Sequence, residues 1–492
     1  MGIIYNGADA RNNISDAFNH YNGKIGIEIR GQSSQMFPMK SYSIELRDNA
    51  GNSTDKSLFG LPKESDWVLY APYSDKTLMR NFLAYTMSRE MGHWAANCRY
   101  VEVILNGSYV GIYVLMEKIK RNSGRVNISK MAATDVSGDA LTGGYIFSID
   151  KEPDGWYSSY APYSNANNAR IRYSYVTPKL SAITIEQSNY LIKYVDSFEN
   201  ALSKSGEIAH LNDWKKFGDE ASFVDFFIVN EISRNVDGYR LSSYFHKDRD
   251  SKKGKIIAGP VWDYDLAFRN ANYCKGSDIE GWAYQFNTTC PDDFFQIPFW
   301  WDHFLKNQSF QDNLKCRWKQ LRTTSLSLSR INLLIDSVYT LTAEARQRHF
   351  QKWPILGQYV WPNPQPIASS YGAEIDFLKS WIESRMNWID KNIPNEGPCY
   401  DYPENLPESI TITGSPNPVT ASYSLILKSK VQQQVEILVA DALGRRVFAR
   451  QLAVNAGYNR LEVDMRSWQT GIYFFRFVAA SGEKMVQKVL KQ

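Results

Sequence analysis

Residues 230–265, NEISRNVDGYRLSSYFHKDRDSKKGKIIAGPVWDYD, carry the clearest indication of the fold. An apolar run at residues 221–232 predicts a helix that leads into this stretch, and residues 242–245 have the pattern of a strand. An isolated acid, Asp237, lies in the loop between them, and the stretch ends in an acid pair, Asp263 and Asp265. A helix and a strand in close succession predict a mixed α+β body.

The chain before this stretch is rich in predicted strands. Apolar residues alternate through residues 24–47, which indicates two strands and a connecting loop. Asn106-Gly107 separates two further alternating runs, residues 100–105 and 109–117, and Asn-Gly in such a position is a strong hairpin signal. Helical spacing at residues 78–91 predicts a helix between the two strand pairs.

Helices dominate the rest of the body. Helical periodicity covers residues 186–203, 326–348 and 373–391, whereas the polar stretch at residues 156–172 predicts a surface loop. A body that is β-rich first and helix-rich second predicts an α+β arrangement compatible with two lobes.

The C-terminal part changes character. Four prolines between residues 393 and 407 predict a linker, and short strands of period two follow. About six short strands in this space are typical of a small β-sandwich. The predicted organisation is a body over residues 1–395, a Pro-rich linker over 396–408 and a β-domain over 409–492.

Composition argues against some classes of function. The net charge of the 492 residues is only +4, and no concentrated basic stripe of a nucleic-acid binder stands out. No apolar run approaches the roughly 20 residues of a membrane span. Aromatic residues make up 14%, which suits a well-packed protein and equally a carbohydrate-binding one. Trp300-Trp301 could stack on a sugar, although buried packing is the favoured interpretation.

The five cysteines leave two interpretations open. Cys274 and Cys290 flank a loop rich in Gly, Asp and Asn, and they would form a reasonable disulfide in an oxidising compartment. The alternative is that all five are free, mostly buried thiols.

The acids and an upstream glycine loop form a pattern that phosphoryl transfer requires. One carboxylate accepts or orients the proton of the substrate hydroxyl, and others hold Mg²⁺ against the phosphates. Asp237 suits the first role, and Asp263 with Asp265 the second. The loop after Gly31, followed by Lys40, could cover and neutralise phosphates. Each feature alone is a weak signal, since Asp-x-Asp often occurs in turns, but their order strengthens the hypothesis.

Several segments in the same order resemble the CotH (spore coat protein H) family of atypical protein kinases. Residues 30–42 are similar to the family's R-G-x-S-S-x-x-x-P-x-K-S-Y segment. Further similar segments are residues 58–62, 66–67, 75–81, 111–117 and 230–265. The resemblance covers residues 1–395 and implies a two-lobed, kinase-like body.

This resemblance implies roles for particular residues. The family is described as secreted or spore-surface kinases that phosphorylate protein Ser/Thr with ATP and Mg²⁺, and Mn²⁺ could replace Mg²⁺. Asp237 would be the catalytic aspartate and Asp263 the principal metal ligand, with Asp265 assisting. The implied nucleotide-binding residues are Arg30, Ser33, Ser34, Lys40 and Glu117, with Arg80 as a weaker candidate.

The chain departs from the family pattern at one position. Kinase-like loops carry an Asn five residues after the catalytic aspartate, and this chain has Ser242 there. Asn235 or Asn270 could take over the metal contact. A catalytically inactive surface or coat scaffold therefore stays open as an alternative, as does a carbohydrate-associated binding protein.

The C-terminal domain resembles the type A sorting domain of the type IX secretion system. The similar segments are residues 415–418, 441–445, 470–473 and the basic end at 484–492. The resemblance implies a secreted or cell-surface protein whose partners are the type IX machinery and a protein substrate, with a Ser-rich acceptor as one option. Such cargo also needs a signal peptide, and residues 1–7 do not have the features of one, so we expect that the leader is missing from this sequence. A generic immunoglobulin-like accessory domain is the alternative.

Overall fold

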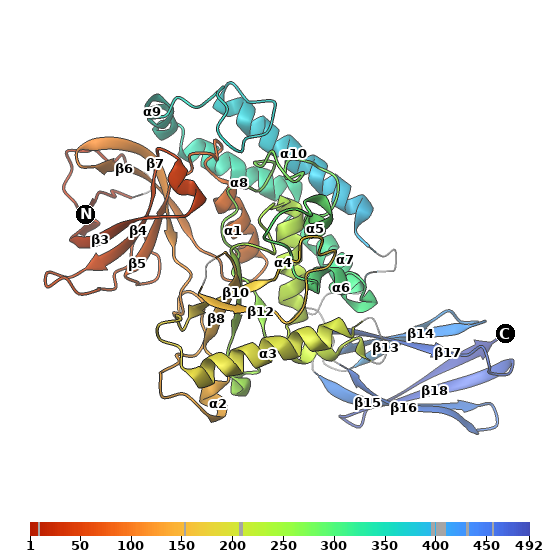
Figure 1. The fold of residues 1–492 in the computed structure, drawn as a ribbon. Coiled ribbons are helices and arrows are strands. Elements are labelled where there is room, and N and C mark those ends of the chain that lie inside the picture. The colour runs from red at the N-terminus through yellow and green to blue at the C-terminus, as the bar shows by residue number, and fades with distance from the viewer. Residues whose placement is uncertain are drawn as a thin grey trace. The chain divides into compact units, whose positions relative to one another are not determined.

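The computed structural model describes residues 1–7, 10–151, 154–205, 210–394, 399, 410–429, 432–454 and 457–492. The chain separates into two compact units, here called unit 1 and unit 2. Unit 1 comprises residues 1–306 and 321–393, and unit 2 comprises residues 307–320 and 394–492. The described residues form several sheets and ten α-helices, so the chain is α+β as predicted (Figure 1).

A five-stranded antiparallel sheet forms the first part of unit 1. Its strands lie in the order β3-β4-β5-β7-β6, and their bounds are Lys24–Arg30, Ser41–Arg47, Asp66–Tyr70, Ser108–Glu117 and Cys98–Leu105. The two predicted strand pairs are confirmed, with Asn106-Gly107 as the turn between β6 and β7. Helix α1 (Arg80–Glu90) confirms the helix predicted between them.

A second antiparallel sheet follows in the order β12-β11-β8-β10-β9. Its strands are Ile257–Ala258, Ser243–Lys247, Tyr145–Ile149, Arg172–Thr177 and Gly155–Tyr157. The prediction of a loop over residues 156–172 is wrong at both ends, because β9 and β10 pair there. Trp156, the central residue of β9, is buried. Short elements complete this part of the chain: β1 (Gly2–Ile3), β2 (Tyr21–Asn22) and α2 (Gly138–Leu141).

Helices α3 (Ile185–Ser203) and α4 (Glu220–Ser233) agree with the predicted helices. Thr184 begins α3 with a capping box to Gln187, which satisfies free backbone donors of the first turn. Helix α4 is buried along nearly its whole length, which explains its continuous apolar sequence. It contacts α1, β12 and α10 and therefore leads the chain through the interior to the loop that contains Asp237.

The remaining helices are α5 (Phe286–Thr289), α6 (Trp300–Phe304), α7 (Gln308–Arg322), α8 (Leu328–Leu341), α9 (Ala345–Lys352) and α10 (Tyr371–Asn392). The single helix predicted for residues 326–348 is wrong in length. Helix α8 ends at Leu341, where the hydroxyl of Thr342 donates to the carbonyl of Val338 at 2.8 Å. A β-branched side chain bonded to its own backbone favours such an end.

Unit 2 contains a three-stranded and a four-stranded antiparallel sheet (Figure 1). The orders are β13-β14-β17 and β16-β15-β18-β19. The strands are Thr411–Ser415, Ser422–Ser429, Gln433–Asp441, Arg446–Val454, Gly457–Asp464, Gly471–Ala479 and Lys484–Lys491 for β13 to β19. Inward-facing residues of both sheets, among them Leu425 and Phe475, form one hydrophobic core, as expected for a β-sandwich.

The predicted linker over residues 396–408 lies, except for Cys399, outside the described residues. In the described part of the chain, we find no helix with the length and hydropathy needed to cross a membrane.

Candidate functional site

Asp237 lies in a loop that the end of helix α4 directs. Arg234 adopts the left-handed conformation (φ 44°) that ends the helix, and its Nε donates to the carbonyl of Lys275 at 2.7 Å. The carboxylate of Asp237 accepts a hydrogen bond of 2.7 Å from Nη2 of Arg240 and stays 23% exposed. The side-chain oxygen of Asn235 accepts from the backbone N–H of Asp237 at 3.2 Å. The acid is therefore oriented and still reachable from solvent.

A buried ion pair holds the base of this loop. Glu231 accepts hydrogen bonds from Nη2 of Arg385 (3.1 Å), the hydroxyl of Tyr239 (3.1 Å) and the backbone N–H of Ala283 (2.7 Å). Arg385 also donates to the carbonyl of Glu231 at 2.8 Å. Breaking such a buried pair costs far more than breaking an exposed one, so the loop rests on a rigid support.

Helix α1 positions the acid pair. Asn81 and Tyr85 lie one turn apart on the same face of the helix, and both accept hydrogen bonds from the backbone of the Asp263–Asp265 segment. The hydroxyl of Tyr85 accepts from the N–H of Asp263 at 3.1 Å, and Oδ1 of Asn81 accepts from the N–H of Tyr264 at 2.6 Å. Asp263 has a positive φ of 66°, a left-handed conformation that Asp adopts more readily than most residues and that these two hydrogen bonds stabilise.

The three acids influence one another electrostatically. Desolvation and then the charge of Asp237 raise the pKa of Asp263. Desolvation and the charges of Asp263, Asp237 and Asp75 raise the pKa of Asp265 well above its usual value. The side chain of Asp263 is exposed to water, yet protein atoms surround it closely enough to remove part of its hydration. The direction of both shifts follows from the like charges as well as from desolvation.

Two tyrosines surround this acid pair. Desolvation and the nearby carboxylates raise the pKa of Tyr70 and of Tyr85 well above the usual value, so both phenols are neutral hydrogen-bonding groups at pH 7. Neither tyrosine stood out in the sequence, because Tyr85 lies 178 residues before the aspartate that it supports.

Two cations lie near Asp263 and lower its pKa, against the effect of the other acids. One is Arg30, whose guanidinium stacks over the ring of Trp262 at 5.6 Å and whose Nη1 is buried without a hydrogen-bond partner. The other is Lys151, whose ammonium is 3.4 Å from the hydroxyl of Ser33. Lys151 was not predicted from the sequence, and it connects the glycine loop with the acids.

The other predicted residues of the glycine loop contact one another. Ser33 and Ser34 begin a 3₁₀ turn (Ser33–Met36), and Nζ of Lys40 donates to the carbonyl of Gln35 at 2.6 Å. Gly31 has a φ of 93°, and a Cβ at this position would lie 2.0 Å from Oγ of Ser34. The turn therefore needs glycine at this position.

Glu117 and Arg80 are buried in ion pairs of their own. Glu117 accepts hydrogen bonds from the N–H and the side-chain nitrogen of Asn97 at 2.9 and 2.8 Å, and Nε of Arg125 lies 4.0 Å from its other oxygen. Arg80 pairs with Asp75 and donates to the carbonyl of Ala267 at 3.1 Å. The contacts of Glu117 therefore lie away from the loop of Lys40, and those of Arg80 support the segment after the acid pair.

The acid pair offers two carboxylates to a divalent cation but no third acidic, His or Cys ligand among the described residues. Among the described residues, no group of three or more His, Cys, Asp or Glu side chains is placed to hold a metal ion. Mg²⁺, however, is usually held by one or two carboxylates together with substrate phosphates and water. Asp263 and Asp265 are two carboxylates whose ionised forms repel each other, and a cation between them would remove that repulsion.

Ser242, the residue at the expected Asn position, has a φ of 45° and its hydroxyl lies 3.5 Å from the carboxylate of Asp150. The amide nitrogen of Asn270 donates to the carbonyl of Asp265 at 2.8 Å, so in this structure Asn270 supports the backbone of the acid pair. Asn235 supports the backbone of Asp237 in the same way.

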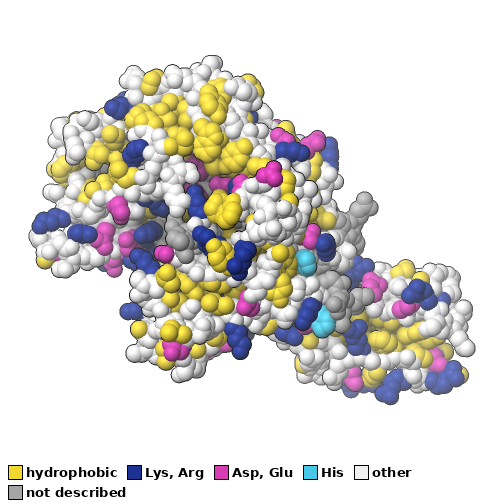
Figure 2. Space-filling view, viewed as in Figure 1, with side chains coloured by type: hydrophobic (Ala, Val, Ile, Leu, Met, Phe, Trp, Pro, Cys, Tyr) yellow, Lys and Arg dark blue, Asp and Glu magenta, His cyan; other side chains and the backbone are white. Residues whose placement is uncertain are grey.

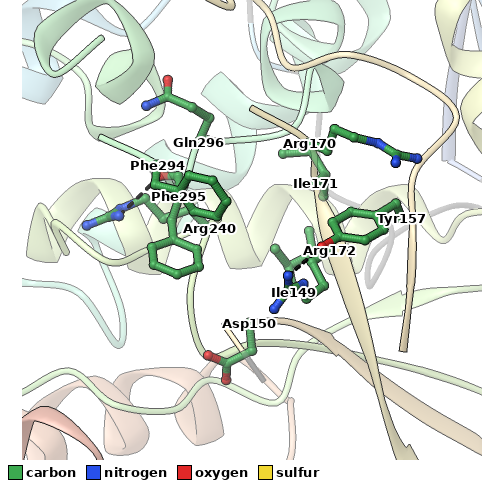
Figure 3. A pocket seen from close by; sticks show the side chains of 10 residues that line it. All are labelled: Ile149, Asp150, Tyr157, Arg170, Ile171, Arg172, Arg240, Phe294, Phe295 and Gln296. Atoms are coloured by element: carbon green, nitrogen blue, oxygen red, sulfur yellow. Dashed lines mark hydrogen bonds between the residues drawn. The ribbon is translucent and has the colours of Figure 1, made fainter. Parts of the chain in front are cut away.

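A pocket opens beside Asp237. Arg240, which holds the carboxylate of Asp237, is one of its lining residues, together with Asp150, Arg170 and Arg172 (Figure 3). Figure 2 shows, on the face of unit 1 that is turned to the viewer, a hollow where acidic, basic and apolar side chains gather. By contrast, Trp300 and Trp301 are fully buried among aromatic rings, so the favoured interpretation as core residues is confirmed.

A disulfide joins Cys274 to Cys290, as one of the two interpretations predicted. It closes a loop that contains Gly281 and Ala283, whose backbone groups bind Arg385 and Glu231. The bridge therefore also supports the loop of Asp237. Cys98 is a buried thiol, and burial raises its pKa to about 12.

Comparisons with protein families match two separate parts of the chain. Residues 27–389 match the family model described as CotH kinase protein. Residues 415–492 match the model described as secretion system C-terminal sorting domain. A search of curated proteins found no match.

Proposed function

The chain belongs to the CotH kinase family, and on that premise we propose that it is an exported protein kinase that transfers the γ-phosphate of ATP to Ser or Thr of a protein. The observation that carries this proposal is the arrangement of three acids, with Asp237 held by Arg240 and the pair Asp263 and Asp265 held by helix α1.

Asp237 is the residue suited to the acceptor hydroxyl. Its carboxylate is oriented by Arg240 and partly exposed, so it can take the proton while the acceptor oxygen forms its bond to the γ-phosphorus and ADP leaves. Asp263 and Asp265 would hold Mg²⁺ or Mn²⁺. The bound ion would neutralise charge on the phosphates.

The basic residues near the acids suit the nucleotide phosphates. Arg30 has an unpartnered buried nitrogen, and the ammonium of Lys151 is 3.4 Å from the Ser33 hydroxyl while its charge lowers the pKa of Asp263. We infer that the loop with Ser33, Ser34 and Lys40 covers the phosphates. In this proposal the first sheet and the second sheet with its helices act as the two lobes of a kinase-like body. Glu117 then contributes indirectly, by supporting the first sheet.

The sorting domain indicates an exported protein. The family match over residues 415–492 supports secretion or display at the cell surface through the type IX machinery. The two antiparallel sheets of this domain and their shared core support an immunoglobulin-like β-sandwich.

One observation favours a second candidate, a kinase-like surface scaffold without transfer activity. Ser242 occupies the position at which related loops supply a metal-binding Asn, and its hydroxyl lies by Asp150. A site with one fewer metal ligand could bind nucleotide without transferring phosphate.

The two candidates are separated by incubation of the purified chain with γ-labelled ATP and Mg²⁺ or Mn²⁺, beside Asp237→Ala and Asp263→Ala. Label on the protein or on a Ser-rich acceptor, lost in both variants, supports the kinase. Nucleotide binding without transfer under either metal supports the scaffold. Absence of nucleotide binding contradicts the site itself. Asp336→Asn, which changes an exposed acid on α8, is the matched control.

A further inference from the structure

Three arginines and two phenylalanines are among the residues that line the pocket beside Asp237 (Figure 3). In this view Arg170, Arg172 and Tyr157 lie on one side, and Arg240 lies on the other with Phe294 and Phe295. Asp150 is the single acid of the lining. No part of the nucleotide or metal proposal uses Arg170, Arg172 or Tyr157.

Arg170 and Arg172 are held on the same aromatic ring. Their guanidinium carbons lie 4.4 and 5.1 Å from the ring centre of Tyr157. Arg172 also donates to the hydroxyl of Tyr157 and, at 3.1 Å, to the carbonyl of Lys151. These contacts hold each arginine side chain against Tyr157, which reduces the entropy that the side chain loses when an anion binds to it.

The three arginines of the pocket differ in whether a carboxylate neutralises their charge. Arg240 is paired with Asp237 at 2.7 Å and Asp293 at 3.2 Å. Among the described residues, neither Arg170 nor Arg172 has a carboxylate partner, and Arg170 is exposed. Asp150 lies with its carboxylate near the hydroxyl of Ser242. The pocket therefore keeps an excess of positive charge on its Tyr157 side.

Arg240 connects the pocket to the proposed catalytic group, Asp237. One guanidinium both lines the pocket and contacts Asp237, so an extended peptide that places a hydroxyl at Asp237 would reach the pocket within a few residues, at roughly 3.3 Å per residue.

We propose that this pocket binds an anionic side chain of the acceptor protein, a carboxylate or a phosphorylated Ser, a few residues from the Ser or Thr that is modified. This inference rests on the proposed kinase function and adds the substrate class. A guanidinium group matches the oxygens of carboxylates and phosphates, and the apolar side chains of Phe294 and Phe295 reduce competition by water. An acceptor already phosphorylated at one Ser would then become a better substrate at the next.

The test uses one peptide series with a central Ser and, at each nearby position in turn, Glu, phosphoserine, Gln or Lys. We expect the wild-type chain to show a kcat/KM at least roughly tenfold higher for the best Glu or phosphoserine peptide than for its Gln counterpart, and lowest for Lys. Arg170→Glu and Arg172→Ala should bring the values for Glu and phosphoserine close to that for Gln. Comparison of Glu with phosphoserine identifies the preferred anion.

Binding provides a readout that does not depend on transfer. Anisotropy of labelled Glu, phosphoserine and Gln peptides, without ATP, should show tighter binding of the anionic peptides to the wild type and loss of that difference in Arg170→Glu. Arg466→Glu, which changes an arginine with a 74% exposed side chain in unit 2, should keep the difference. Equal binding and equal transfer for Glu, Gln and Lys peptides would overturn the inference while leaving the kinase proposal intact. Preferential anion binding with no transfer to any acceptor would instead contradict the kinase function alone.

Discussion

Arg240 and Asp237 form an ion pair of 2.7 Å in which the arginine side chain is 3% exposed and the aspartate 23%. The same guanidinium binds Asp293 at 3.2 Å. A buried cation therefore holds a partly open acid, and it joins the loop after α4 to the segment that follows the disulfide. The pair connects the proposed acid–base group to the proposed acceptor pocket.

We predict that the acid pair lowers the stability of the folded protein when no cation is bound. Burial and like charge raise the pKa values of Asp263 and Asp265, so the folded state keeps their protons to higher pH than the unfolded state does. The cation-free protein should therefore gain stability as the pH falls through these raised values. Asp265→Asn should raise Tm by several degrees at neutral pH without divalent cations, because it removes the repulsion.

Differential scanning fluorimetry with and without Mg²⁺ or Mn²⁺ checks this prediction. The cation should raise the Tm of the wild type more than that of Asp265→Asn, which keeps only one of the two carboxylates. A lower Tm for Asp265→Asn without cation, or equal cation effects on both proteins, would contradict the electrostatic account.

Lys151 should matter more to nucleotide binding than Lys40. The ammonium of Lys40 is bonded to the Gln35 carbonyl, whereas that of Lys151 is 3.4 Å from the Ser33 hydroxyl and its charge lowers the pKa of Asp263. We expect Lys151→Ala to raise KM for ATP by roughly tenfold, the loss of one charge-assisted contact, and Lys40→Ala to change it less. Steady-state kinetics at varied ATP measures both. The reverse order would place the phosphates at Lys40 instead.

Much of this arrangement could be predicted from the sequence. Asp237 in the loop between a helix and a strand, and Asp263 with Asp265 after the strand, predicted a group of acids, and Asn106-Gly107 predicted the hairpin of β6 and β7. The partners of the acids could not be found in this way. Lys151 and Tyr85 are separated from the acids by long stretches of chain, and only tertiary folding shows their proximity. The break between α8 and α9 at Thr342 does not interrupt the helical periodicity, so the pattern of the sequence did not reveal it.

The disulfide should stabilise the support of Asp237. Cys274 and Cys290 are 16 residues apart, and closing a loop of this length contributes about 3 kcal/mol in the chain-entropy model. The double variant Cys274→Ser/Cys290→Ser should lose about this much free energy of unfolding in urea denaturation. Reductant should destabilise the wild type similarly and leave the double variant unaffected. A reductant effect of equal size in both proteins would point to another cause.

Glu199 predicts a pH dependence of stability separate from the acids of the site. Burial raises its pKa to about 7, although Tyr173 (2.7 Å) and Trp300 (2.9 Å) donate hydrogen bonds to it. The folded state holds this proton more tightly than the unfolded state, so this stability contribution is complete below pH 4.5 and is lost as the pH rises to about 7. The shift corresponds to on the order of 3 kcal/mol.

Glu199→Gln keeps the shape of the side chain and removes the titration. The difference in unfolding free energy between variant and wild type should therefore move in favour of the variant between pH 5 and 8, on the scale of about 3 kcal/mol. Denaturant titrations at several pH values measure it. A difference that stays constant across this range would show that Glu199 titrates normally in the folded protein.

The central claim is phosphoryl transfer with Asp237 as the group that receives the acceptor proton. Its most direct test is the rate of γ-phosphate transfer from saturating ATP to a Ser-rich acceptor, measured for the wild type and Asp237→Asn. The account predicts a loss of roughly 100-fold or more in kcat with unchanged nucleotide affinity, since the amide cannot take the proton. Transfer by Asp237→Asn at the wild-type rate would contradict it.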